Sequence, residues 1–252
     1  MSAPAVAAIR RRMSVAWLLA LVLAIATATV AEYAARVLPR PAPFGELAYY
    51  PSGRYLRPAT LGHAETAADL AWLRAVQYYG ERRRTDNRFD QLEHVFDILT
   101  SLSPGFDGAY VFGAFALAQE GGRFPQAERL ILSGLEHNPR SGELAFETGF
   151  LYYVRPGGRD LRRAAEYFEL AARLPGSPPS ATRFAAFCRQ NAGSLEVAYE
   201  LWSDVFKSTQ NQYMREIAAR QMQRIHTAIE NHWPSSAIDR LATPQVRIRS
   251  AS

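Results

Sequence analysis

The chain has 252 residues, of which 48% are hydrophobic and 12% aromatic, so it can bury a core and is not a disordered chain. Its net charge of +5 becomes 5 − 3 = +2 without the clustered Arg10, Arg11 and Arg12, which argues against a nucleic-acid-binding surface. The single cysteine, Cys188, excludes an internal disulfide framework and a multi-thiolate metal site.

An uncharged, apolar stretch follows these arginines and extends from Met13 to Ala31. As an α-helix it would be about 28 Å long, close to the thickness of the hydrocarbon layer of a membrane. The basic residues in 1–12 favour a cytoplasmic N-terminus, so the remainder is expected outside the cytoplasm. We predict a single-pass signal anchor in the cytoplasmic (inner) membrane, with a periplasmic domain. A cleaved signal peptide is the alternative, with a weak cleavage site at 29–31.

Two further segments lack the pattern of a long helix. Residues 32–64 are rich in proline and glycine, which predicts an extended spacer. Residues 234–252 carry no helical stripe, and we expect a flexible tail there. The regular part of the sequence therefore lies between these two segments.

One spacing of residues recurs four times in that regular part. Its type example is Phe124, Ala127, Ile131, Gly134 and Pro139, at intervals of 3, 4, 3 and 5 residues. The copies begin at residues 89, 124, 161 and 195, so the periods are 35, 37 and 34 residues. Intervals of three and four place side chains on one stripe of a helix, and the proline cannot continue that helix. The fourth copy keeps the apolar positions and lacks the proline.

Each copy is preceded by another predicted helix, which makes the repeating unit a helical hairpin. These first helices are expected at about 67–80, 108–120, 143–154 and 181–191, with short glycine-containing breakers before the second helices. An insertion, ERRRTDN at 81–87, lies between the helices of the first pair, and its arginine run 82–84 predicts a solvated loop. After the last pair, 213–233 form an amphipathic pattern that suits a capping helix.

The period of about 35 residues resembles that of the tetratricopeptide repeat (TPR). Trp72 with Tyr79, Gly113, and Gly149 with Tyr152 match the aromatic and small positions of that family's first helix. The resemblance covers 65–212. It implies an all-α fold, an α-solenoid of about four TPR-like hairpins plus a C-terminal capping helix, preceded here by a single N-terminal transmembrane helix.

The resemblance also implies a concave groove, lined by the first helix of each hairpin, in which partner segments bind. Gln77 and Tyr153 are the favoured candidates because a polar tip prefers some contact with water. Phe146, Phe150 and Phe187 could equally pack between helices. Projected onto this sequence, the protein-binding groove contains Leu73, Gln77, Tyr110, Phe146, Phe150, Tyr153, Arg183, Phe187 and Gln190.

No catalytic motif is found in the sequence, so no catalytic, cofactor-binding or metal-binding residue is assigned. Glu143 and Glu147 are four residues apart, and a solvated helix face explains them better than a reactive carboxylate pair. We expect a non-enzymatic scaffold that binds a protein partner, as a recruiter or as an accessory or assembly subunit of a multi-subunit membrane complex, without nucleic acid. The alternatives are a cell-envelope enzyme with the solenoid as substrate platform, and a self-associating structural protein.

Overall fold

The computed structural model describes residues 17, 20–30, 32–33 and 51–238, and the chain divides into two units, 1–48 and 49–252. In the first unit, residues 20–30 are helical and expose apolar side chains, among them Leu21 and Leu23. The predicted span 13–31 lies partly outside the described residues. Among the residues that are described, no helix has both the length and the hydropathy needed to cross a membrane.

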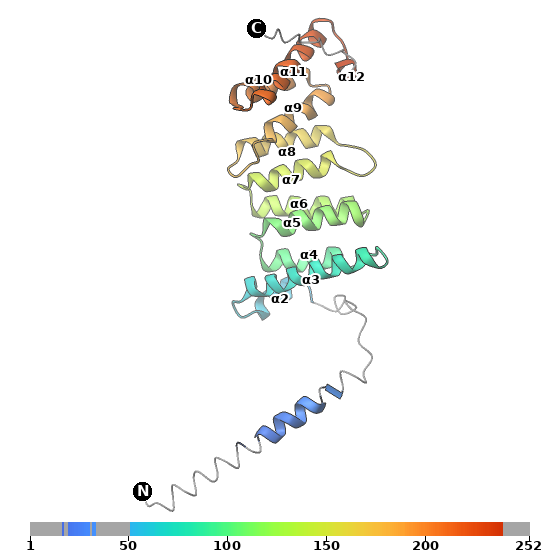
Figure 1. The fold of residues 1–252 in the computed structure, drawn as a ribbon, viewed down its shortest axis with the longest axis vertical. Coiled ribbons are helices and arrows are strands. Elements are labelled where there is room, and N and C mark those ends of the chain that lie inside the picture. Colours follow the sequence, from blue (N-terminus) through green and yellow to red (C-terminus); the bar gives the residue numbers. More distant parts are fainter. Residues whose placement is uncertain (1–16, 18–19, 31, 34–50, 239–252) are drawn as a thin grey trace, which may run out of the picture. The chain divides into compact units, whose positions relative to one another are not determined.

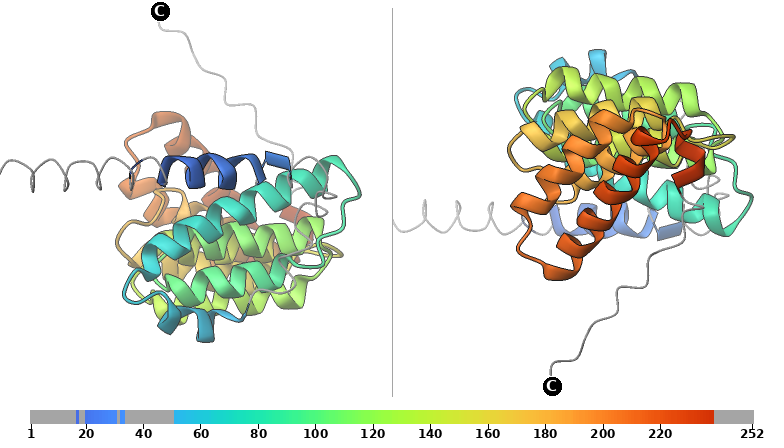
Figure 2. Two further views of the ribbon diagram at one scale, coloured as in Figure 1. Left: turned by 90° about the horizontal axis from the view of Figure 1, so that it is seen from below. Right: turned by 90° about the horizontal axis from the view of Figure 1, so that it is seen from above.

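The second unit is a stack of helical hairpins in chain order (Figure 1). Seen along the stack, successive helices are turned relative to one another (Figure 2). No β-strand occurs between residues 51 and 238, so the prediction of an all-α fold built from helical hairpins is confirmed. The hairpins are α3 (Ala64–Arg84) with α4 (Leu92–Leu102), α5 (Asp107–Phe115) with α6 (Phe124–His137), α7 (Gly142–Tyr153) with α8 (Leu161–Arg173), and α9 (Ala181–Asn191) with α10 (Leu195–Ser208).

The three middle positions of the repeat are buried in the core. Their side chains lie on the buried stripe of the second helix of each hairpin, where apolar burial contributes about 25 cal/mol per Å². The buried sets are Leu92, Phe96 and Leu99 in α4, Ala127, Ile131 and Gly134 in α6, Ala164, Phe168 and Ala171 in α8, and Ala198, Trp202 and Val205 in α10. The long helix α11 (Gln212–Glu230) packs on α10 and closes the stack.

Glycines at the helix contacts let neighbouring helices approach closely. A methyl group on Gly134 would lie 2.6 Å from Cγ of Tyr110, and one on Gly149 would lie 2.9 Å from Cδ1 of Phe168. Both distances are shorter than a carbon–carbon contact of about 3.5 to 4.0 Å. A small residue is therefore required at each of these two positions, because a large side chain of the neighbouring helix occupies the space opposite it.

Polar side chains connect the second hairpin to the third. The hydroxyl of Tyr152 in α7 and the guanidinium of Arg163 in α8 both donate to Oε1 of Glu128 in α6, at 2.7 and 2.6 Å. Burial, together with the hydrogen bond to Glu128, raises the pKa of Tyr152. Nearer the start of α7, the Ser141 hydroxyl donates to Asp107 and accepts the Leu144 N–H, which caps the helix.

The arginine run does not form the predicted loop, because α3 continues through Arg84. Arg82 pairs with Asp86 at 3.0 Å, and its guanidinium carbon lies 5.4 Å from the ring centroid of Tyr78. Arg83 pairs with Glu120 in the next hairpin. These contacts extend the helix by a full turn beyond the residues that periodicity assigned to it.

Three further elements depart from the prediction. A short helix, α2 (Gly53–Ala59), lies within the predicted spacer and packs on α4. The first helix of the second hairpin ends in a π-helical turn, η2 (Ala116–Glu120), which packs against α5 and α6. The predicted tail begins with α12 (Ser235–Ile238), whose Ile238 is fully buried in the core formed with α10 and α11, and the tail beyond residue 238 lies outside the described residues.

Candidate protein-binding surface

Five partly exposed aromatic side chains form a connected row across the first helices of three hairpins. The ring of Phe115 in α5 lies 6.0 Å from that of Phe150 in α7. Tyr153, one turn further along α7, lies 5.9 Å from Phe150 and 6.1 Å from Phe187 in α9. Phe184 in α9 completes the row, 6.2 Å from Phe150 and 5.9 Å from Tyr153. We call Phe115, Phe150, Tyr153, Phe184 and Phe187 the aromatic row.

The local sequence explains why these rings meet. Phe150 and Tyr153 are three residues apart, as are Phe184 and Phe187, so each pair lies on one side of its helix. The Ser141 cap fixes the start of α7, and α9 follows directly on Ser180. The two pairs then come together because α7 and α9 both pack against α8.

Buried aromatic side chains support the row from below. Phe168 of α8 is fully buried, and its ring lies 5.2 Å from Phe184. Phe146 of α7 lies 5.1 Å from Phe168 and 5.6 Å from Phe184. Edge-to-face and tilted ring contacts of this kind stabilise the arrangement beyond area burial alone, by about 0.5 to 1.5 kcal/mol per pair. Phe184 of the row is therefore fixed by contacts with the buried core.

Two arginines adjoin the row. The guanidinium carbon of Arg159, in the loop between α7 and α8, lies 4.7 Å from the ring centroid of Tyr153. That of Arg183, in the first turn of α9, lies 5.5 Å from the ring centroid of Phe184. Between residues 51 and 238, neither arginine is paired with a carboxylate. The row therefore combines apolar rings with positive charge.

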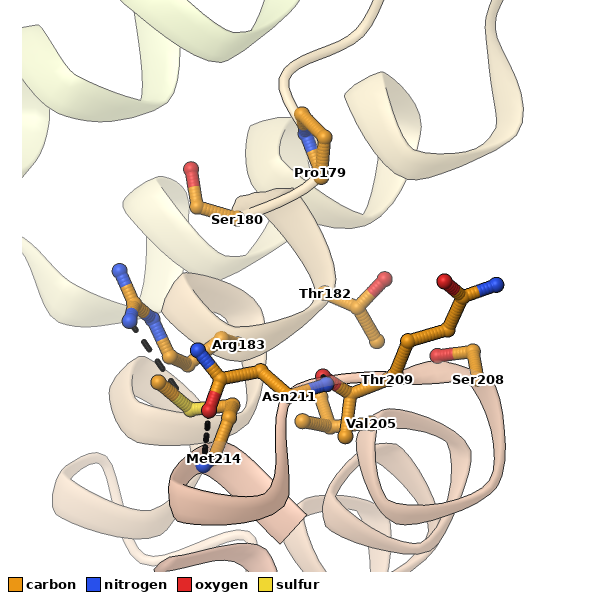
Figure 3. A pocket seen from close by; sticks show the side chains of 10 residues that line it. Pro179, Ser180, Thr182, Arg183, Val205, Ser208, Thr209, Asn211 and Met214 are labelled. Atoms are coloured by element: carbon orange, nitrogen blue, oxygen red, sulfur yellow. Dashed lines mark hydrogen bonds between the residues drawn. The ribbon is translucent and has the colours of Figure 1, made fainter.

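A cleft of about 560 Å³ lies next to the row, where α9 begins and α10 is joined to α11 (Figure 3). Arg183 lines it together with the hydroxyls of Ser180, Thr182 and Ser208. Asn211 lies directly before α11 and caps this helix by accepting the Met214 N–H at 3.2 Å. Arg183 is thus shared by the cleft and the row.

Four of the predicted groove residues belong to this surface. Phe150, Tyr153 and Phe187 are members of the aromatic row, and Arg183 lines the cleft. Phe187 is 37% exposed and the other three are partly buried. Leu73 and Gln77 are exposed on α3, in the first hairpin, whereas the row begins in the second.

The remaining three predicted residues are buried and contribute to packing. Tyr110 fills the space opposite Gly134, and burial, with the nearby charge of Asp107 as a lesser cause, raises its pKa to about 12. Phe146 lies beneath the row. Gln190 accepts the indole N–H of Trp202 at 3.1 Å and donates to Gln221 at 3.4 Å. Their side chains are not offered to a partner in this structure.

Sequence reasoning did not assign Phe115, Phe184 or Arg159 to the surface. Phe184 could have been found from its three-residue spacing to Phe187. Phe115 could have been found from its spacing of 35 residues to Phe150, which equals the spacing of the predicted first helices 108–120 and 143–154. Arg159 is on a loop, where helical spacing gives no information.

The two carboxylates of the candidate pair on α7 differ in burial. Glu143 is exposed and Glu147 is half-buried, and burial, followed by repulsion from Glu143, raises the pKa of Glu147. Within the described ranges, no three histidine, cysteine or acidic side chains are placed to hold a metal ion. Burial likewise raises the pKa of the Cys188 thiol to about 12, so little thiolate forms at neutral pH.

The fold and this surface define a class, an all-α protein of stacked helical hairpins with an aromatic row across its first helices. Comparison of the chain with protein-family models, with curated proteins and with solved structures gave no match. The function is therefore argued from the geometry of the described residues.

Proposed function

We propose that this protein is a non-enzymatic interaction scaffold of the TPR type, which binds an extended segment of a protein partner along the aromatic row. The observation that carries the proposal is the continuity of the row, because five partly exposed rings touch across three hairpins. Aromatic and arginine side chains dominate binding energetics at protein interfaces. Rings held by Phe146 and Phe168 also lose little conformational entropy when a partner binds.

The described hairpins support the TPR assignment. The three middle positions of the repeat are buried in all four second helices, and small residues lie where helices come closest. Stacking of such hairpins gives each one contacts mainly to its neighbours and leaves a continuous face of first helices. A partner could be recruited to this face, or the protein could serve as an accessory subunit of a larger membrane complex.

The binding surface is tested by removing two rings from the row. We expect the double variant Tyr153→Ala with Phe187→Ala to weaken partner binding by about 30-fold, the loss of about 2 kcal/mol typical of interface hot spots. The full-length protein is purified from membranes in mild detergent, and co-purifying proteins are quantified by mass spectrometry. The matched control is Tyr199→Ala with Phe206→Ala, because these aromatics on α10 are 37% and 38% exposed, as Phe187 is 37% exposed.

Retention of the partner by the row variant, with loss in the α10 variant, would place binding elsewhere. Recovery of no partner, together with hydrolytic turnover by the purified chain, would refute the scaffold. Recovery of this chain alone as an oligomer would favour self-association.

We further propose that residues 13–31 anchor the scaffold in the cytoplasmic membrane, with the hairpins on the periplasmic side. The described helical residues of this segment expose apolar side chains that water solvates poorly. We expect the chain to remain with membranes after alkaline carbonate extraction, and we expect Ala24→Arg, which costs about 3 kcal/mol at the centre of a span, to weaken that retention. Ser2→Arg is the control. A mature protein that starts near Glu32 would refute the anchor in favour of a cleaved signal peptide.

A further inference from the structure

The cleft beside the aromatic row is lined by uncharged residues around one arginine. Among the residues that line it, Arg183 is the charged one, and the others contribute hydroxyl, amide and a few apolar groups. Its volume of about 560 Å³ is far larger than a carboxylate group requires. Figure 3 shows the cleft between the start of α9 and the chain that enters α11.

Arg183 has donors that are poorly used within the protein. A guanidinium carries five N–H donors in a planar fork. Here one of them points at Sδ of Met214 at 3.9 Å, and a thioether is a weak acceptor. The ring of Phe184 lies to one side of the guanidinium, and residues 51–238 supply no carboxylate partner. The arginine is therefore positioned by packing and keeps donors for a ligand.

Among the residues that the structure describes, no acidic side chain lines the cleft itself, and charges of both signs lie around it. Arg215 of α11 donates to the Thr209 carbonyl oxygen at 2.9 Å, which places a second cation beside the α10–α11 connection. Arg159 adds a third along the row, over Tyr153. The adjoining cleft, which shares Thr182 and Ser208, is lined by three carboxylates and two cations: Glu169, Glu200, Asp204, Arg173 and Lys207. A ligand that brings a negative charge to Arg183 therefore gains a local partner.

We infer that the cleft binds the side-chain carboxylate of an aspartate or glutamate within the partner segment, while the apolar neighbours of that residue contact Phe184 and Phe187. This inference rests on the proposed function, since it names the chemistry of the segment that the aromatic row holds. A planar guanidinium matches a carboxylate with two parallel hydrogen bonds, which fixes the register as well as adding affinity. The partner recognised here is an extended segment in which acidic and apolar residues alternate.

The test uses two short peptides as probes, both N-acetylated, C-amidated and labelled with rhodamine. One has the sequence Phe-Glu-Leu-Glu-Ser-Gly, and in its twin glutamine replaces both glutamates. Fluorescence anisotropy with the full-length protein in a neutral detergent is expected to show the glutamate peptide binding about tenfold more tightly than the twin, as a charge-assisted pair allows. That preference should shrink when salt is raised from about 50 mM to about 500 mM.

Substitutions at residue 183 locate the effect. Arg183→Gln should abolish the tenfold preference, whereas Arg183→Lys should keep part of the preference because it keeps the charge. The control is Arg162→Gln, an exposed arginine on α8 away from the cleft, which should change neither affinity. Melting temperatures of the variants show whether the fold is retained.

The outcomes separate this inference from the proposed function. Equal affinities for the two peptides would overturn the acidic ligand and would leave the row as a peptide site, provided that Tyr153→Ala weakens both. Loss of both peptides in Arg183→Gln would show a structural role for the arginine and would also overturn the inference. Failure of both peptides to bind the wild-type protein would count against the row and the cleft together.

Discussion

Replacing Phe168 with alanine should lower the free energy of unfolding by about 4 kcal/mol, because a fully buried phenylalanine is lost and a cavity remains. Phe168 is 0% exposed and contacts Phe146 and Phe184, so its removal also takes away the support of the aromatic row. The measurement is urea denaturation of the full-length protein, followed by tryptophan fluorescence.

The matched control for this substitution is Phe206→Ala. It removes the same side chain from a position that is 38% exposed on α10, so we expect a loss below about 1 kcal/mol. Similar losses for the two variants would mean that the core around α8 is not packed as described. A large loss for Phe168→Ala should also weaken binding along the row, although Phe168 itself has no access to a partner.

Replacing Gly134 with valine should destabilise the second hairpin by about 3 kcal/mol, since overpacking in a close helix contact displaces a neighbour. The first added carbon would lie 2.6 Å from Cγ of Tyr110, which is 1% exposed and has no room to move outward. Thermal unfolding by circular dichroism measures the effect.

Gly80→Val makes the same change in α3, where no atom lies within 4 Å of the added carbon. It should raise stability slightly, by roughly 0.5 kcal/mol, because valine has a higher helix propensity than glycine. Opposite signs for the two substitutions would establish that the glycine at 134 is required by packing. A loss of similar size at both positions would contradict that explanation.

Much of the hairpin architecture could be predicted from the sequence because every hairpin meets the same kind of neighbour. The predicted helix 181–191 coincides with α9, and the helices α6, α8 and α10 begin at 124, 161 and 195, where the repeat begins. Each unit repeats one pattern of large and small side chains, and that pattern is local enough to be read in a window of about 35 residues. Burial of the repeated positions follows from it.

The elements α2 and η2 were missed for different reasons. Gly53 of α2 packs against Ser101 in α4, and Arg57 donates to the Ser101 carbonyl oxygen at 3.5 Å, so this short proline-containing helix is stabilised from outside. The π-helical turn η2 shifts the hydrogen bond of Gly121 to Ala116. A turn of that kind adds a residue to the helix without leaving a compositional mark.

The candidate surface was predictable in its helices and less so in its residues. Tyr110 and Phe150 were both assigned to the groove because they lie on first helices, α5 and α7. Of these two residues, only Phe150 is partly exposed. Tyr110 is buried because its ring packs against Gly134. Arg183 was assigned from its place in the repeat, whereas the cleft that it lines depends on α11, which lies outside the repeat.

The hydrogen bonds to Glu128 have a mechanical consequence. Glu128 stands on a second helix and joins both helices of the following hairpin, whereas Phe115 and Phe150 stand on the first helices of the same two hairpins. The angle between these hairpins sets the distance from Phe115 to Phe150. Loss of the Glu128 carboxylate would allow the angle between these two hairpins to vary more. The distance from Phe115 to Phe150, and with it the spacing of the rings that a partner contacts, would then vary as well.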